Sequence, residues 1–562
     1  MAITFVPYFI GLSKANGRVF LWLAYNLDDS CAYLSWMRQA ASGSGKVLNL
    51  FTTDPQHGLA PNPFFWVLGR LAGILHLPLI FMYHLARFVC GVGLLLAIWE
   101  FLNLNDIKEN TQKLAFLFVC FSSGLGWLPF FWNEAAPQPI DTWQPEAITF
   151  LSLYLSPLFC FSLALQVGII SLLLKAEKSG EIRFALLAGV CGFILGLAHT
   201  YDIVSISLVW SLYLIKQMLF PTSPSNRVKL MIQAACTGVM TLPAVAFIAY
   251  ELRNEAVFQQ RANVQTLSAN IQWVFWGYGL TLVLAILGAV SSRFKPNKSD
   301  ADTLISPIPW LLVFWAIANV AAAYLPTAFQ RKMLQGSHIP IAILAGIGAC
   351  WLYDRMNASR FKFGFAAYAL IATLILSLTN IRFVLRDLDG YTANLAHTGV
   401  HRTYIQPGEV LALEWIEKNT ASGTPIQPLP WLDIAETPDG KRAIYKKDMA
   451  IACLTPGLTN RPVYCGHWGE TPDYAGSPPE NRGKLFEIGS LLQPQLSDID
   501  RVELIKKMKV KYLLFSQKAA VAPSDEINSL APIFRNQLPL PRYLTLRYSN
   551  PEADVYEFTP EN

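Results

Sequence analysis

Residues 79–103 read LIFMYHLARFVCGVGLLLAIWEFLN, and this stretch decides the class of fold. A helix needs about 20 largely apolar residues to cross the hydrocarbon core of a bilayer, and this stretch is longer than that. Similar stretches recur along the chain at 113–132, 150–174, 184–198, 203–215, 228–250, 272–291, 306–325, 338–353 and 363–386. The pattern predicts a polytopic α-helical membrane protein.

The composition supports this class and excludes others. Of the 562 residues, 53% are hydrophobic and only 15% are charged, which is too apolar for one soluble core of this length. The 16 tryptophans suit the interfacial belts of a membrane protein. The net charge of +5 is spread through loops, so no nucleic-acid surface is expected. No glycine-rich phosphate loop with a lysine is present, which argues against a protein that hydrolyses cytosolic ATP.

The positions of lysine and arginine predict the topology, because these residues favour short cytoplasmic loops. Basic residues fall in the predicted inside loops 104–112, 175–183, 216–227, 292–305 and 354–362. The predicted outside segments are 13–78, 133–149, 199–202, 251–271, 326–337 and everything after 387. We therefore expect about eleven helices with the N-terminus inside and the C-terminus outside. That number includes a first helix whose outer half is AITFVPYFIGL (2–12) and whose start we expect upstream.

The composition changes after residue 386, which predicts two domains. Residues 1–386 form the transmembrane domain, with a first outer loop at 13–78, and 387–562 form a small extracytoplasmic α/β domain. Its periodicity predicts helices at 407–419 and 498–509, strands at 461–467 and 510–516, and a hairpin of 542–549 with 553–559. Cys453 and Cys465 lie in this domain and either pair in a local disulfide or remain free.

Two adjacent carboxylates open the first outer loop, in the stretch YNLDDSCAYLSWMRQA (25–40). Polar groups near membrane depth are costly unless they have a task. Consecutive side chains point in different directions, so one of Asp28 and Asp29 can act while the other orients or binds a cation. Asp54 is a candidate neighbour. The alternative is structural: both aspartates suit the first turn of a capped amphipathic helix lying on the membrane.

Four further polar groups share the predicted outer face. They are Glu146 in TWQPEAITF; His199, Tyr201 and Asp202 in LAHTYDIV; Gln330, Arg331 and Lys332 in PTAFQRKMLQGSHIP; and His467, Trp468 and Glu470 in RPVYCGHWGETPDY. Arginine offers a planar fork for phosphate and lysine a point charge. Aromatic and acidic residues together suit sugar binding. Each group also has a structural alternative. Glu146 can simply cap a helix, and the His199 group can simply form a turn. The Arg331 group can be attracted to anionic lipids, and the His467 group can be a loop of turn residues.

This arrangement resembles the GT-C superfamily of integral-membrane glycosyltransferases. The similar features are aspartates in the first outer loop, an acidic second outer loop, a basic outer loop before the last helices, and an outward C-terminal domain. The segments NLDDSCAYLSWMRQA, NPFFWVLGRLA, YHLARF, PEAITFLSL, FQRKMLQGSHIP and YCGHWGETPDY resemble those of a bacterial family within that superfamily. The short first helix departs from the pattern.

The resemblance implies a glycosyltransferase in the cell (inner) membrane. It would move a sugar, with inversion, from a polyprenyl-phosphate carrier to a lipid, glycan or protein acceptor on the outer face. By match to the superfamily's first-loop aspartate, Asp28 or Asp29 is the expected general base. Arg331, with Lys332 and Gln330, is expected to stabilise the departing phosphate.

The remaining polar residues receive supporting roles. Glu146, His199 and Asp202 are expected to bind acceptor hydroxyls or to hold a divalent cation, since some members of the superfamily use a metal and others do not. His467 and Trp468 are expected to help choose the acceptor.

Two other classes compete with the enzyme. A transporter also has broken helices, but its ionisable residues should lie deep within the spans, and these spans are almost free of them. A non-catalytic scaffold that presents the outer domain is the third interpretation. Normal assembly together with loss of transfer on mutation of the aspartates would separate an enzyme from a scaffold.

Overall fold

The computed structural model describes residues 1–105, 107–129, 138–220, 224–291, 308–357, 364–394, 401–429, 431–436, 442–476, 483–491, 496–516 and 541–560. The chain forms two compact units. Unit 1 comprises Met1–Phe5, His84–Tyr250 and Gln265–Leu385, and unit 2 comprises Val6–Tyr83, Glu251–Val264 and Arg386–Asn562. The predicted loop 292–305 and parts of the predicted loops 104–112, 133–149, 216–227 and 354–362 lie outside the described residues.

Long apolar helices dominate the chain and make it a multi-pass membrane protein. Among the described residues, six helical segments are long and apolar enough to cross a bilayer: α4 (Leu79–Leu104), α7 (Pro157–Ser179), α9 (Tyr201–Leu219), α10 (Pro224–Asn254), α12 (Ile271–Ser291) and α14 (His338–Asn357) with the short η5 (Gln330–Leu334) before it. The pair α15 (Phe365–Leu376) and α16 (Leu378–Ala393), bent by 52°, would make a seventh. The shorter helices α8 (Ile182–Ala198) and α13 (Ile308–Ala322) are also apolar. The total of about eleven spans stays a prediction.

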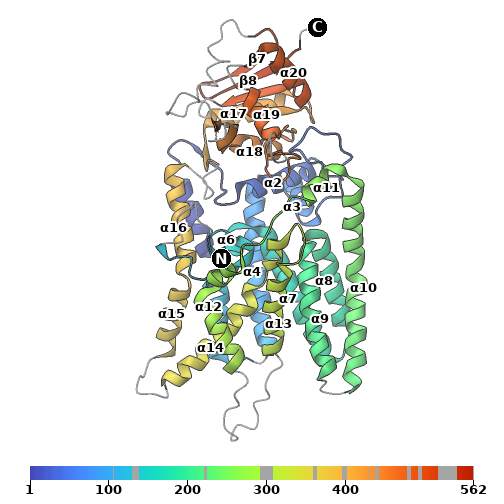
Figure 1. Ribbon diagram of the computed structural model, residues 1–562, viewed down its shortest axis with the longest axis vertical. Coiled ribbons are helices and arrows are strands. Elements are labelled where there is room, and N and C mark those ends of the chain that lie inside the picture. The colour runs from blue at the N-terminus through green and yellow to red at the C-terminus, as the bar shows by residue number, and fades with distance from the viewer. Residues whose placement is uncertain are drawn as a thin grey trace. The chain divides into compact units, whose positions relative to one another are not determined.

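Unit 1 is built mainly from these helices. Figure 1 shows α7, α8 and α9 with roughly parallel axes, and α7 packs on α8, which packs on α9. Leucine, valine and isoleucine side chains stay exposed on α8, α10 and α12, among them Leu187, Val239 and Val283. In water such a surface would be unfavourable, whereas lipid tails are as apolar as these side chains.

Besides the bent pair α15 and α16, two predicted spans differ from the helices that form. The stretch 113–132 gives only α5 (Glu109–Phe121), because the chain turns at Ser122. The backbone N–H groups of Gly124 and Gly126 then donate to the Asp141 carboxylate, at 2.9 and 3.2 Å, in place of continuing the helix. The stretch 150–174 is broken into α6 (Thr149–Leu155) and α7, because Pro157 cannot donate to the preceding turn.

Glycines let α12 and α14 approach closely. A Cβ atom at Gly288 would lie 2.0 Å from the Leu344 carbonyl oxygen, and one at Gly348 would lie 2.1 Å from that of Leu284. Small residues at crossing points are the usual means by which membrane helices gain packing contacts. This crossing fixes α14, which directly follows η5.

Unit 2 joins the N-terminal segment to the C-terminal region. Strand β1 (Val19–Phe20) pairs antiparallel with β2 (Tyr404–Ile405). Helix α2 (Leu27–Ala41) packs on α3 (Pro63–Leu75) and on α18 (Ala450–Thr459). A short helix, α11 (Ala256–Ala262), belongs to the same unit. The first outer loop thus folds with residues far along the chain.

A four-stranded sheet forms the rest of unit 2. Its strand order is β3 (Ile426–Pro428), β6 (Tyr512–Ser516), β8 (Ala553–Phe558), β7 (Leu544–Ser549), with only the β3–β6 pair parallel. Its helices include α17 (Pro407–Asn419), α19 (Lys484–Leu491) and α20 (Asp498–Met508), and β4 (Trp431–Glu436) pairs with β5 (Arg442–Asp448) as a separate hairpin. The predicted helices at 407–419 and 498–509 and the terminal hairpin are therefore confirmed.

The predicted strand at 461–467 is wrong, because this segment is an extended loop. Pro462 lacks an N–H group, and the segment makes only isolated backbone bonds. Ile426 donates to the Pro462 carbonyl, and Val463 donates to the Leu50 carbonyl, at 2.9 and 2.8 Å. The loop therefore bridges parts of unit 2 without joining the sheet.

Candidate functional site

The two adjacent aspartates lie in the first turn of α2. Asn26 occupies the N-cap position, and Asp28 and Asp29 follow it. Carboxylates are stabilised here by the positive end of the helix dipole. At 3.6 residues per turn, neighbouring side chains diverge by about 100°, so the two carboxylates meet different surroundings. Each faces its own histidine.

Asp28 is held in a buried cluster. Its Oδ1 atom lies 2.8 Å from Nε2 of His401 and accepts a hydrogen bond from the Cys453 thiol at 3.2 Å. Burial acts to raise the pKa of Asp28, but the attraction and hydrogen bond of His401, with help from His467 and the Cys453 thiol, hold that pKa far below its usual range. Asp28 is therefore an ionised group whose Oδ1 atom is held by two partners.

Asp29 is the accessible member of the pair, with 41% of its side chain exposed against 19% for Asp28. It accepts a short hydrogen bond from the Asn26 side chain, and Nε2 of His467 lies 3.9 Å from its Oδ1. The His467 ring is fixed from its other side, where Nδ1 accepts the backbone N–H groups of Gly469 and Glu470 at 2.9 and 3.0 Å.

The tautomer of His467 follows from these bonds. Because Nδ1 accepts two hydrogen bonds, the proton of the neutral ring sits on Nε2, which has no hydrogen-bond partner among the described residues. The buried His467 thus directs an N–H toward the exposed carboxylate of Asp29. Asp29 is open to solvent, with Asn26 as its hydrogen-bond donor and the His467 N–H 3.9 Å away.

The cluster of Asp28, His401 and Cys453 has the residue types of a metal site, with ligand atoms within 4.8 Å of one another. One observation argues against it. Nδ1 of His401 faces the backbone N–H of Met449 at 3.3 Å, whereas a histidine that binds a metal through Nε2 normally donates from Nδ1. The Cys453 sulfur also lies 2.6 Å from the Gly466 carbonyl oxygen, so two oxygen acceptors share its single S–H proton.

The pKa of Cys453 agrees with that protonation state. Burial, and then the charge of Asp28, raises it well above the usual range of a thiol. The bond from the Met449 N–H to Nδ1 of His401 is the observation that argues against a metal here, so the three residues fit a hydrogen-bonded cluster better than a metal centre. Cys453 and Cys465 are both free and buried, and they form no disulfide in the structure.

A basic cluster forms in unit 1 around η5, at the predicted phosphate-binding residues. Nε of Arg331 lies 3.7 Å from Oε1 of Glu146, and its guanidinium lies 5.5 Å from the Trp143 ring centroid. The Gln144 side chain donates to the Arg331 carbonyl at 2.8 Å and holds the backbone. The Arg331 side chain makes no hydrogen bond to another described residue. It therefore keeps its donors available.

Lys332 lies beside the residues of the LAHTYDIV turn. Its Nζ contacts the Tyr201 hydroxyl at 3.3 Å and lies 4.7 Å from the ring centroid. Nδ1 of His199 lies 2.9 Å from Oδ2 of Asp202, which also accepts from Gln335 at 3.2 Å. Asp202 is only 1% exposed, and although it lies close to His199, Nδ1 of that histidine has no hydrogen-bond partner among the described residues. The Asp202 carboxylate is therefore a buried neighbour of His199 that is not placed to touch a substrate.

Two predicted residues have other partners. The Gln330 side chain donates to the Leu325 carbonyl at 2.9 Å and accepts from the Ser268 backbone at 3.3 Å, which shapes the loop. In unit 2, Oδ2 of Asp54 lies 2.6 Å from Nζ of Lys484. These contacts give Gln330 and Asp54 local structural tasks.

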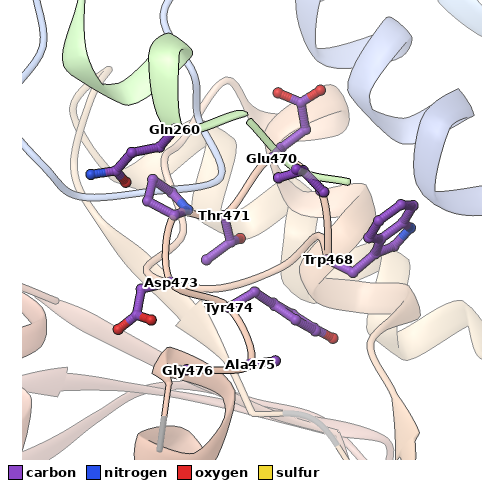
Figure 2. Close-up of a pocket in the computed structure, with 11 residues that line it drawn as sticks. Gln260, Trp468, Glu470, Thr471, Asp473, Tyr474, Ala475 and Gly476 are labelled. Carbon is purple, nitrogen blue, oxygen red and sulfur yellow. The ribbon is translucent and has the colours of Figure 1, made fainter. Parts of the chain in front are cut away.

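A pocket of about 570 Å³ lies in unit 2 beside the HWGETPDY loop. Its lining comprises Gln260 of α11, Val264 and residues 468–476. Figure 2 shows Trp468 and Gln260 at opposite ends of this lining and the carboxylates of Glu470 and Asp473 pointing in different directions. Two predicted acceptor residues, Trp468 and Glu470, therefore line one pocket.

The chain resembles known proteins in structure but not in sequence. No protein-family model matches the chain, and no curated protein matches its sequence. Solved structures do match. ArnT from Cupriavidus metallidurans is 14% identical in the apo state (TM-score 0.50) and 12% identical bound to undecaprenyl phosphate (TM-score 0.52), and both comparisons cover 99% of this chain and 96% of that chain.

A third match is the archaeal oligosaccharyltransferase AglB from Archaeoglobus fulgidus, in complex with an inhibitory peptide and a dolichol-phosphate. It is 12% identical, with a TM-score of 0.46, over 92% of this chain and 69% of that chain. The likeness to ArnT over nearly the whole of both chains decides the architecture. This chain has the GT-C fold.

Within this GT-C fold the predicted site residues form two groups. Asp28, Asp29, Asp54, His467, Trp468 and Glu470 belong to unit 2, and Glu146, His199, Tyr201, Asp202, Gln330, Arg331 and Lys332 belong to unit 1. Each group gathers residues from several segments of its own unit.

Sequence reasoning missed some members of both groups. In unit 2 it missed His401 as a site residue and considered Cys453 only as a free thiol or a disulfide partner of Cys465. In unit 1 it missed Trp143 and Gln335. Cys453 and Asp28 are 425 positions apart, and no local spacing reveals such a contact. The available signal was chemical: His401 is one of only eight histidines in the chain.

Proposed function

We propose that the chain transfers a sugar from a polyprenyl-phosphate donor to an acceptor hydroxyl on the outer face of the cell membrane. The GT-C fold supports this, as does the fact that one matching structure is ArnT bound to undecaprenyl phosphate. The observation that carries the proposal is the contrast between the two aspartates. Asp28 is paired with His401 and the Cys453 thiol and is 19% exposed, whereas Asp29 is 41% exposed and hydrogen-bonds only to Asn26 among the described residues.

In the proposed reaction Asp29 is the general base. It accepts the proton of the acceptor hydroxyl while that oxygen bonds to the anomeric carbon of the donor. The bond from the anomeric carbon to the phosphate oxygen breaks, and polyprenyl phosphate leaves with the electron pair. A single displacement of this kind inverts the anomeric configuration. General base catalysis typically contributes a factor of about 10²–10⁴.

The leaving phosphate gains negative charge, and we assign its stabilisation to Arg331 and Lys332. Preorganised donors aimed at developing charge are usually the largest single contribution to catalysis. Arg331 suits this role because its donors are not consumed by other described residues. Glu146 and Tyr201 contact these two cations and orient them, and Gln330 shapes the loop that carries them.

Parallel variants of the two aspartates test the assignment. Purified full-length protein in nanodiscs is incubated with a panel of polyprenyl-phosphate sugars, and transfer is followed by mass spectrometry. We expect Asp29→Asn to lower the rate at least 10²-fold with little change in unfolding temperature. His467→Ala is expected to lower the rate less, because the carboxylate remains.

Two results would overturn the proposal. Wild-type activity of Asp29→Asn would remove this residue from the chemistry and favour a non-catalytic scaffold. A product of retained anomeric configuration, read by NMR from the coupling constant of the anomeric proton, would exclude a single displacement.

A further inference from the structure

The pocket bounded by α11 and residues 468–476 is a distinct recognition feature of unit 2. We propose that it binds a sugar unit of the acceptor that carries no negative charge, either neutral or amine-bearing. This inference rests on the proposed function and narrows its acceptor from lipid, glycan or protein to a glycan.

The pocket is rigid because its loop is anchored by buried hydrogen bonds. The Thr471 hydroxyl accepts from the backbone N–H groups of Gly466 and His467, at 3.2 Å each, and donates to the Phe51 carbonyl at 2.9 Å. The Asn49 side chain donates to the Glu470 carbonyl at 2.7 Å. These bonds leave few ways for the loop to collapse, so little conformational entropy of the loop is lost when a ligand binds.

The second half of the loop is fixed through its backbone. The N–H groups of Lys484 and Leu485 donate to the carbonyls of Asp473 and Tyr474, at 2.9 and 3.1 Å. A Cβ atom at Gly483 would lie 2.2 Å from the Gly476 nitrogen, so the backbone at Gly483 packs directly against the backbone at Gly476. A volume of about 570 Å³ lies within the range of small-molecule sites, roughly 300–1,000 Å³.

The lining has the chemistry of a sugar site. Trp468, with 37% of its surface exposed, offers an apolar ring, and Asp473 and Gln260 offer groups that can accept or donate hydrogen bonds to hydroxyls. Apolar surface with a few placed polar groups is the usual composition of a pocket that fixes one orientation of its ligand. Figure 2 shows the Glu470 and Asp473 carboxylates directed apart, which does not suit a shared cation.

The charge of the lining sets the selectivity. The described lining includes two carboxylates, Asp473 and the largely buried Glu470, and contains no lysine or arginine. A phosphorylated or acidic sugar would meet like charge here, which is an effective means of rejecting a wrong partner. An amine-bearing sugar would instead meet opposite charge, and a neutral sugar would use the hydroxyl contacts alone.

The loop also links this pocket to the proposed base. The Trp468 ring stacks on the ring of His467, with centroids 6.3 Å apart and planes 20° apart. Nε2 of the same His467 faces Asp29. A sugar that contacts Trp468 would therefore act on the side chain that orients the carboxylate.

Saturation-transfer NMR on the full-length protein in nanodiscs, without donor, tests the proposal. The probes are a neutral methyl hexoside, the corresponding 2-amino sugar and the hexose 6-phosphate. We expect saturation transfer to the first two and none to the phosphate. Trp468→Ala should weaken binding at least tenfold. Asp473→Asn should reduce the preference for the amino sugar over the neutral one, and asparagine tolerates the positive φ of 53° at this position.

Matched controls lie on α20, away from the pocket lining. Glu503→Gln removes a carboxylate whose side chain is 68% exposed, and Ile499→Ala removes an apolar side chain that is 77% exposed. Both should leave binding unchanged. Preferential binding of the phosphate, or unchanged binding by Trp468→Ala, would overturn the proposal.

The outcome separates this proposal from the proposed function. Binding needs no proton transfer, so Asp29→Asn should retain it. Sugar binding lost in Trp468→Ala, together with full transfer by Asp29→Asn, would refute the base and keep the pocket. Transfer lost in Asp29→Asn with unaltered sugar binding by Trp468→Ala would keep the base and refute the pocket.

Discussion

At the scale of the residue, the two aspartates show how adjacent and identical side chains acquire different tasks. Asp28 gains a histidine and a thiol as partners and loses most of its contact with water, and Asp29 keeps solvent on one side. The sequence places both in one helical turn and treats them alike. Only their partners, which are His401, Cys453 and His467, distinguish the two. They leave Asp28 held within the fold and Asp29 free to accept a proton.

Asp28 is predicted to stabilise the fold in a pH-dependent way. A hydrogen bond to a charged group contributes about 1.5–3 kcal/mol, so Asp28→Asn should lower the free energy of unfolding by that amount at pH 7. Because the folded-state pKa is depressed, this contribution is complete above the unfolded-state value of about 3.9. It is lost as the pH falls through the folded-state pKa.

Thermal melts of detergent-solubilised wild type and Asp28→Asn from pH 7 down to pH 3 check this. The gap between their unfolding temperatures should be constant to about pH 5 and narrow below about pH 4. Glu503→Gln, which alters a carboxylate whose side chain is 68% exposed, serves as the control. A gap that widens on acidification would contradict the role assigned to Asp28.

Arg331 is predicted to act through the geometry of its guanidinium as well as through its charge. Lysine keeps the charge and loses the bidentate fork. We expect Arg331→Lys to reduce kcat/KM for the polyprenyl-phosphate donor about tenfold. Arg331→Ala should reduce it about 10²–10³-fold, the usual loss for a donor to developing charge.

Steady-state kinetics with varied donor concentration checks this prediction. Arg183→Lys and Arg183→Ala change an arginine whose side chain is 69% exposed, elsewhere in unit 1, and provide the control. Equal activity of the Arg331→Ala protein and the wild type would remove Arg331 from the donor site.

At the scale of the element, sequence periodicity predicts helices well wherever burial and lipid are the dominant forces. The helix at 407–419 forms as expected, because Pro407 begins it and Glu409 completes a capping box with Gln406. Periodicity fails where single side chains override it. Asp141 holds the chain after α5 through the Gly124 and Gly126 amides, and burial raises its pKa to about 7 despite those bonds.

The crossing of α12 and α14 is predicted to be intolerant of any added side chain. Gly348→Ala would place a Cβ atom about 2.1 Å from the Leu284 carbonyl oxygen, and overpacking of this kind costs about 1–3 kcal/mol or more. We expect a lower unfolding temperature and, because α14 follows η5, a weaker donor affinity. Gly93→Ala in α4, where a Cβ atom meets nothing within 4 Å, is the matched control.

Size-exclusion chromatography with fluorescence detection after heating would compare the two glycine variants. Gly93→Ala should melt at or slightly above the wild-type temperature, since alanine favours helix by about 1 kcal/mol over glycine. Similar melting of both variants would show that the close approach at Gly348 is not required.

At the scale of the whole molecule, the distribution of basic residues predicts an extracytoplasmic C-terminal region. Cysteine introduced at Ile499, which is 77% exposed on α20, should react with a membrane-impermeant maleimide in intact cells. Cysteine at Ser179, at the end of α7 beside Lys175 and Lys178, should react only after permeabilisation. The unsubstituted protein corrects for the native cysteines, and the reverse labelling pattern would invert the topology.

The sequence by itself determined the class of the molecule, most of its helices and the chemical types at its candidate site. Hydrophobicity and charge are local properties of the chain, so the apolar stretch 79–103 and the segment FQRKMLQGSHIP can be interpreted from the sequence alone. The tertiary structure decided which residue has which role within the site. Which aspartate is open, and which thiol is protonated, depends on partners hundreds of positions away, because burial and hydrogen bonding are properties of surroundings that only folding assembles.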